Sequence, residues 1–313
     1  MTTQAAWQHK RADVNGISLH YVEQGQGYPL ILVHGFPETW YSWRHQIPAL
    51  AEAGFHVIAV DLRGYGESDR PAPLEEYDIH HLVADLVGLM DALEIEKCVL
   101  IGHDWGSNVV WMTALQHPDR VERVVSLNIP YRGGPCMPRP EMLKKMDARF
   151  SYVVYFQEPG AAERFLESDV QQHLGKMYEY CAARPDFLSS DELKVFVDAF
   201  SHSGFTTPIN LYRNIDRNWD TTEDLANKPV EQESLLILSD KQRTPVWPDA
   251  PWTPPGYDAP VSGAQIPEGL ERFVPRLHTE MILDCGHWSN QEKPAEVNAL
   301  ILAFLGDLAA RSR

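Results

Sequence analysis

The 313-residue sequence contains little cysteine and no long apolar run. Its four cysteines are Cys98, Cys136, Cys181 and Cys285, and no two of them form a CxxC pair. The spacing argues against a cysteine-based metal site, so buried free thiols in a reducing, cytoplasmic setting are the simplest interpretation. No stretch reaches the ~20 apolar residues that span a bilayer, and residues 1–10 lack the apolar core of an export signal. We therefore expect a soluble cytoplasmic protein without a membrane partner.

Basic residues are also scarce, since 27 Lys and Arg face 44 Asp and Glu. The resulting formal net charge of -17 repels phosphate backbones and anionic surfaces, which excludes nucleic acid as an expected partner. Hydrophobic residues make up 44% and charged residues 23%, values typical of a globular protein. A chain of this length fits one main domain that carries a sizeable insertion.

Short apolar runs alternate with helical patterns in the first ~130 residues, which predicts an α/β fold with a mostly parallel sheet flanked by helices. The expected strands are Ile17–Glu23, Leu30–His34, Val57–Asp61, Cys98–Ile101 and Val121–Asn128. The expected helices are Trp43–Ala53, Ile79–Leu93 and Ser107–His117. Pro118 ends the last of these helices.

The pattern changes after Pro130, where residues 131–225 become helical and rich in aromatic side chains. We expect this segment to form a lid, or cap domain, inserted into a core of residues 1–130 and 226–313. The core resumes with the strands Ser234–Ser239 and Leu277–Asp284 and the helix Pro294–Leu308. Between the two strands, residues 244–269 are rich in proline and include Trp247 and Trp252, which predicts a long loop.

The chemistry is expected at Gly102-His103-Asp104-Trp105-Gly106, which follows a predicted strand and opens a predicted helix. A sharp strand-to-helix turn of the form G-x-D-x-G, which we call the elbow, places its central side chain at the end of the sheet where the parallel strands end. Serine at the centre suits acyl transfer, whereas a carboxylate attacks saturated carbon to give an alkyl-enzyme ester. A plain glycine-rich turn with a capping Asp104 is the alternative, and two further motifs argue against it.

The first motif is His34-Gly35-Phe36-Pro37 after a buried strand. In folds with this elbow, such a turn faces the nucleophile, so the backbone N–H groups of Phe36 and Trp105 are candidates for an oxyanion hole. The second is Gly286-His287-Trp288, which follows the last strand. His287 therefore comes after Asp104 in chain order, as the general base does in this fold.

These motifs resemble those of the epoxide hydrolases of the α/β-hydrolase fold, the group related to the soluble mammalian and plant enzymes. The matching segments, spread over nearly the whole chain, are His34–Glu38, Asp61–Gly66, the elbow around Asp104, Tyr155–Gly160, Tyr212–Asn214 and Gly286–Trp288. The resemblance implies that Asp104 opens an epoxide and that His287 activates water to release a vicinal diol. It also implies that a small epoxide and water are the substrates, with no cofactor or metal.

The resemblance further implies that Tyr155 and Tyr212, both in the lid, hydrogen-bond the epoxide oxygen. An alkoxide is a poor leaving group, so ring opening needs a strong hydrogen bond or a proton there, which phenols supply. Asp61 and Arg63, by contrast, are expected to fix a loop.

The acid that should orient His287 departs from the family pattern. The matching position holds Gln242, and the second place where related hydrolases put this acid holds Asn128. Asp240 is the nearest carboxylate, and it becomes the acid if the loop is locally shifted. Both Asp240 and an enzyme without the acid remain open.

Two rival functions remain. A haloalkane dehalogenase also uses Asp and His under a lid, and Trp105 could hold a halide, although Phe36 stands where those enzymes usually have Asn or Trp. A ligand-binding member of the fold with impaired catalysis would explain Gln242. The sequence leaves open which epoxide is used, whether the chain forms a homodimer, and whether the role is detoxification, catabolism or biosynthesis.

Overall fold

The computed structural model describes residues 7–134, 138–146, 150–244, 247, 249–253, 261 and 268–309. Cys136 and most of the expected proline-rich loop lie outside these residues. Cys98, Cys181 and Cys285 are buried free thiols, which confirms the prediction for these three. Within the described part of the chain, no helix is long and apolar enough to cross a membrane.

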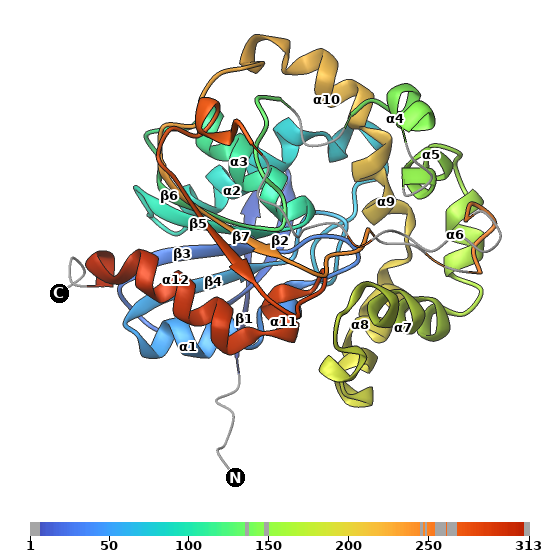
Figure 1. The fold of residues 1–313 in the computed structure, drawn as a ribbon, viewed down its shortest axis with the longest axis horizontal. Coiled ribbons are helices and arrows are strands. Elements are labelled where there is room, and N and C mark those ends of the chain that lie inside the picture. Colours follow the sequence, from blue (N-terminus) through green and yellow to red (C-terminus); the bar gives the residue numbers. More distant parts are fainter. Residues whose placement is uncertain are drawn as a thin grey trace.

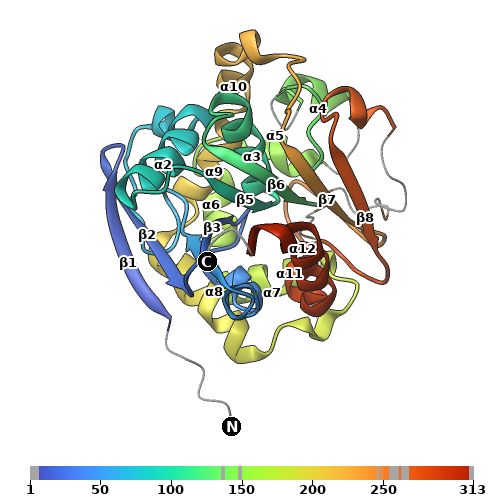
Figure 2. The same ribbon diagram turned by 90° about the vertical axis from the view of Figure 1, so that its left-hand side faces the viewer.

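The centre of the fold is a sheet in which eight described strands are ordered β1-β2-β4-β3-β5-β6-β7-β8. Their bounds are Gln8–Val14 (β1), Ile17–Gln24 (β2), Tyr28–Val33 (β3), Phe55–Val60 (β4), Cys98–His103 (β5), Val121–Leu127 (β6), Glu233–Ser239 (β7) and Leu277–Ile282 (β8). The strands from β4 to β8 in this order are parallel, whereas β1 and β2 are antiparallel to their neighbours. Figure 2 shows β1 and β8 at opposite edges of the sheet.

Helices cover both faces of the sheet (Figure 1), which confirms the predicted α/β class. One face carries α1 (Gln46–Glu52) and α12 (Pro294–Ala309), and the other carries α2 (Ile79–Ala92) and α3 (Trp105–Gln116). Since both faces are covered, a central strand such as β5 is buried at every residue and reads as one continuous apolar run. The parallel strands therefore all end at the same edge, where the loops of a functional site can meet.

A group of helices lies between β6 and β7 in the chain, and Figure 1 shows it beside one end of the sheet. Its members are α4 (Pro140–Met146), α5 (Ser151–Phe156), α6 (Ala161–Leu166), α7 (Val170–Cys181), α8 (Ser190–Ser203), α9 (Thr206–Arg213) and α10 (Ile215–Thr221). We call these helices the lid; the domain limits at residues 130 and 225 stay a prediction. The short helix α11 (Ser289–Glu292) precedes α12, and 3-10 turns occupy Trp40–Trp43, Leu74–Tyr77, Pro185–Phe187, Glu223–Leu225 and Leu270–Arg272.

Candidate active site

Asp104 occupies the turn between β5 and α3 with a backbone conformation that side chains rarely adopt, φ 51° and ψ -120°. Two glycines make the turn geometrically feasible. A Cβ atom on Gly106 would lie 2.0 Å from the carbonyl oxygen of Val33, and one on Gly102 would lie 2.5 Å from the backbone of Gly106. Any side chain at either position would push strand and helix apart, so the G-x-D-x-G sequence is what lets Asp104 stand at the end of the sheet.

The Asp104 carboxylate is held by backbone donors on one side. Its Oδ1 accepts a hydrogen bond of 2.9 Å from the N–H group of Phe36, and the N–H group of Trp105 also donates to the carboxylate. Burial raises the pKa of Asp104, while the neighbouring His103 and the two N–H donors favour the ionised form. The structure thus brings both predicted oxyanion-hole donors to Asp104.

His287 faces the other carboxylate oxygen, with its Nε2 3.8 Å from Oδ2 of Asp104. The loop that carries it is fixed through the backbone: its N–H group donates to Cys181, and its carbonyl accepts from His103 Nε2 at 2.8 Å and Asn128 Nδ2 at 2.6 Å. The ring is 1% exposed, and burial, reinforced by the charge of His103, lowers its pKa to about 3. Neither ring nitrogen forms a hydrogen bond with any described residue. His287 is therefore a neutral imidazole that no acid among the described residues orients.

A first difference from the sequence prediction concerns Asp240, the carboxylate expected to orient His287. Asp240 Oδ1 accepts a hydrogen bond of 3.2 Å from the backbone N–H of Cys285, so its carboxylate ties β7 to the loop after β8. The structure also records no bond from Gln242 to the ring of His287. Asn128, the second position considered, bonds the carbonyl of His287 and not its imidazole.

A second difference from the sequence prediction concerns the tyrosine beside Tyr212. The Tyr155 ring packs on Trp252, with centroids 4.6 Å apart. Tyr152, one helical turn earlier in α5, lies beside Tyr212 at 5.8 Å between ring centroids and is 5% exposed. Tyr212 itself packs edge-on against Trp105 at 5.1 Å, next to the nucleophile. The signal missed in the sequence was helical spacing, because Tyr152 and the buried Phe156 are four residues apart and share one face.

Burial decides the protonation state of Tyr212. Its pKa is raised well above the ordinary value, first by burial and then by the nearby Tyr152 and Asp104. A phenol that stays protonated beside a carboxylate is a hydrogen-bond donor. The lid therefore presents a donor to the space next to Asp104.

Trp247, from the proline-rich stretch, closes this space. Its ring centroid lies 6.4 Å from that of Phe36, 6.2 Å from that of Tyr152 and 6.1 Å from that of Phe156. The residue is 1% exposed, and its indole Nε1 has no hydrogen-bond partner among the described residues. The sequence indicated a loop here but gave no sign that its tryptophan packs against the oxyanion-hole residue.

A buried ion pair lies under the elbow. Glu38 accepts hydrogen bonds from His103 Nδ1 at 2.7 Å and from the N–H group of Gly35 at 2.8 Å. Although burial opposes both charges, the pair keeps the pKa of His103 above and that of Glu38 below their ordinary values. The pair joins the turn after β3 to the elbow and, through His103 Nε2, to the carbonyl of His287.

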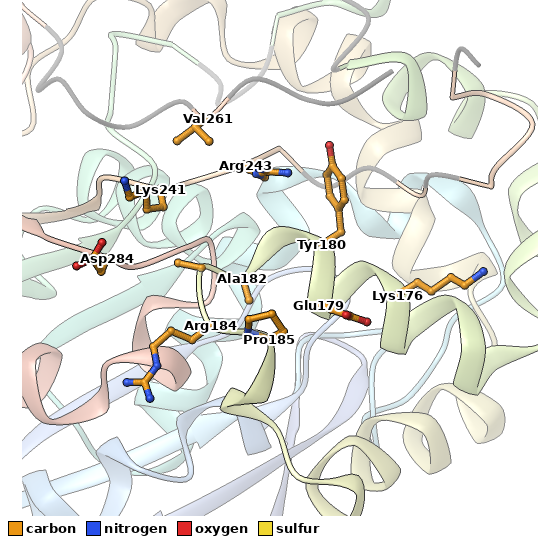
Figure 3. Close-up of a pocket in the computed structure, with 11 residues that line it drawn as sticks. Lys176, Glu179, Tyr180, Ala182, Arg184, Pro185, Lys241, Arg243, Val261 and Asp284 are labelled. Atoms are coloured by element: carbon orange, nitrogen blue, oxygen red, sulfur yellow. The ribbon is translucent and has the colours of Figure 1, made fainter. Parts of the chain in front are cut away.

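A surface cavity of about 740 Å³ lies between residues of the lid and residues that follow β7 and β8, and Figure 3 shows the side chains that line it. Four basic side chains line it, Lys176, Arg184, Lys241 and Arg243, together with Glu179 and Asp284. None of the residues gathered around Asp104 is among them. This cavity is therefore not the space in which Asp104 could meet a substrate.

One group of side chains in the described part of the chain has donor atoms arranged as metal ligands, namely His9, His20 and Glu67. His9 and His20 belong to β1 and β2. The strands β4 and β3 separate β2 from β5, so the group is distinct from the surroundings of Asp104.

Comparison with known proteins gives consistent matches. The family model of the α/β hydrolase fold matches residues 28–294. Epoxide hydrolase A of Mycobacterium tuberculosis (strain ATCC 25618 / H37Rv) is 39% identical, over 96% of this chain and 97% of its own length. Bifunctional epoxide hydrolase 2 of Sus scrofa is 35% identical over 93% of this chain, which spans 53% of the pig protein. The solved structure of an epoxide hydrolase from an endophytic Streptomyces has a TM-score of 0.87 and 33% identity, with 97% of each chain covered.

Proposed function

Since this chain belongs to the epoxide hydrolases of the α/β-hydrolase fold, we propose that it converts a small epoxide and water into a vicinal diol through an ester on Asp104. The observation that carries the proposal is the environment of the Asp104 carboxylate. Oδ1 is held by the Phe36 N–H group, while Oδ2 lies on the side of His287. A carboxylate presented in this way is a nucleophile for saturated carbon.

In the first step, Oδ2 of Asp104 attacks a ring carbon of the epoxide and the carbon–oxygen bond of the ring breaks. The electron pair of that bond goes to the epoxide oxygen, which takes a hydrogen bond or a proton from the lid. Tyr212 and Tyr152 are the donors, because they lie side by side next to Trp105 and the pKa of Tyr212 is raised by burial.

In the second step, water attacks the ester carbon of Asp104. His287 Nε2 accepts the proton of the water, and the N–H groups of Phe36 and Trp105 hold the oxyanion on Oδ1. The bond between the ester carbon and Oδ2 then breaks, Oδ2 takes the proton from His287 and leaves in the diol, and the oxygen of the water restores the carboxylate. The second proton of the water returns to the tyrosine that protonated the epoxide oxygen. Because burial leaves His287 neutral, it is ready to take the proton but stabilises it poorly.

The function is tested with a panel of epoxides and a panel of chloroalkanes of matched size. We expect diol from at least one epoxide and no halide from any chloroalkane, because tyrosine donors suit an alkoxide and Phe36 supplies no side-chain donor for a halide. Halide release without diol formation would replace the proposal by a dehalogenase. Tight epoxide binding with no product would replace it by a ligand-binding protein.

The tyrosine assignment gives a paired prediction. Tyr152→Phe should slow formation of the alkyl-enzyme by roughly 10- to 1000-fold, since it removes one hydrogen bond to the developing alkoxide. Tyr155→Phe is the matched control on the same helix, and it should change the rate little because its ring packs on Trp252. Stopped-flow or quenched-flow measurement of the pre-steady-state phase gives both rates. A slow Tyr155→Phe enzyme with an unaffected Tyr152→Phe enzyme would reverse the assignment.

A further inference from the structure

The hairpin of β1 and β2 places two histidines on one face at the edge of the sheet. His9 pairs with Val22 and Arg11 pairs with His20, so the two histidines are diagonal neighbours across the strands. Their rings stack with centroids 5.2 Å apart, and Nδ1 of His9 lies 3.0 Å from Nε2 of His20. The carboxylate of Glu67 completes the group, with all three ligand atoms within 4.8 Å of one another.

His20 is oriented by a buried carboxylate behind it. Its Nδ1 lies 2.7 Å from Oδ2 of Asp61, and both side chains are 1% exposed. Asp61 is itself fixed by the N–H groups of Trp40 and Glu67. Asp61 thus engages Nδ1 of His20, and Nε2 of the same ring faces Nδ1 of His9.

This arrangement has the features of a protein site for a divalent transition metal. Histidines that bind such ions usually donate their second ring N–H to a carboxylate, as His20 does to Asp61. Zn²⁺ binds imidazole nitrogen at about 2.0–2.1 Å, so two such ligands lie about 2.9 Å apart at a right angle and about 3.3 Å apart in a tetrahedron. The observed 3.0 Å falls between these values. His9 and Glu67 are exposed, which leaves the group open to ions from solution.

We propose that His9 Nδ1, His20 Nε2 and the Glu67 carboxylate form a binding site for one divalent transition metal ion such as Zn²⁺, with water completing the coordination. Arg11 approaches Glu67 at 3.6 Å and must release it when the ion binds. The ion then takes the place of the hydrogen bond between the two rings. Since β1 and β2 carry the histidines and Glu67 follows β4, the ion would fasten the edge hairpin to the rest of the sheet.

The test uses untagged full-length protein that has been freed of metal with a chelator. Zn²⁺ is titrated against a competing chromophoric chelator, and Co²⁺ absorption reports the ligand geometry. We expect one ion per chain for the unaltered protein, and an affinity at least about 10-fold lower for His9→Gln and for Glu67→Gln. Both residues are exposed, so folding should be preserved.

His278→Gln is the control, because His278 is an exposed histidine on β8 at the opposite edge of the sheet. It should bind Zn²⁺ as the unaltered protein does. Zn²⁺ should also raise the melting temperature of the unaltered protein and of His278→Gln, but not that of His9→Gln. Equal Zn²⁺ affinity for all variants, or no binding by the unaltered protein, would overturn the proposal and leave His9 and His20 as a hydrogen-bonded pair.

Discussion

Asp104→Ala should reduce diol formation by at least about 10³-fold, because the nucleophile is lost and no other carboxylate contacts the Phe36 donor among the described residues. The variant should also form no adduct, since the ester is made by Asp104 itself. Intact-mass spectra with saturating epoxide and a steady-state assay of the diol measure the two effects.

Asp198→Ala is the control for this experiment, because Asp198 is exposed and its carboxylate is paired with Lys194. It should retain the activity of the unaltered enzyme. Thermal unfolding of both variants checks that lost activity does not reflect lost structure. Diol formation above a few per cent of the unaltered rate in Asp104→Ala would rule out this nucleophile.

Gln242→Asp should accelerate hydrolysis of the ester, on the order of 10²-fold or more. The reason is the state of His287, whose pKa is lowered to about 3 mainly by burial and whose Nδ1 has no partner among the described residues. A carboxylate at this position would stabilise the imidazolium that forms when water is deprotonated. In serine proteases the reverse change, Asp to Asn, slows the reaction by about 10⁴-fold, which sets the scale. Ester should accumulate during turnover of the unaltered enzyme and disappear in Gln242→Asp.

Asp240→Asn separates this prediction from its rival. In the unaltered protein the Asp240 carboxylate accepts a hydrogen bond from the backbone N–H group of Cys285. Asp240→Asn should therefore lower the stability of the fold more than the rate of ester hydrolysis. Burst and steady-state rates of Asp240→Asn and Gln242→Asp show whether Asp240 is the acid that orients His287. A stalled Asp240→Asn enzyme together with a silent Gln242→Asp change would make Asp240 the acid after all. If neither variant has an effect, the acid lies elsewhere; of the two remaining candidates, Asp249 is paired with Lys176 and Asp258 lies outside the described residues.

The sequence predicted the central strands because burial on both faces makes them continuously apolar. It did not predict β1, whose burial alternates only at its end and whose residues Gln8 to Arg11 are exposed. An edge strand of this kind has few apolar residues to mark it, and its identity comes from pairing with β2. The same pairing brings His9 and His20 together. Because the two histidines are eleven residues apart in the sequence, their spacing alone did not indicate the proposed metal site.

Within the candidate site, the backbone motifs were predictable and the side-chain partners were not. Asp104 and the donors of Phe36 and Trp105 follow from turns whose geometry glycine imposes. The pairing of Tyr212 with Tyr152 depends on which face of α5 is buried. Trp247 packs against Phe36 and Phe156, which lie far from it in the sequence, and no local pattern specifies such contacts.

The two oxygens of the Asp104 carboxylate have different surroundings, and under the proposed mechanism they have different histories. Oδ1 stays with the Phe36 N–H group, whereas Oδ2 departs in each diol and is replaced by an oxygen from water. Oδ1 would thus be the atom incorporated when the protein was synthesised, whereas Oδ2 would come from the water used in the last turnover. After many turnovers in oxygen-18 water, Asp104 should carry one heavy atom and not two, unless the carboxylate rotates between cycles.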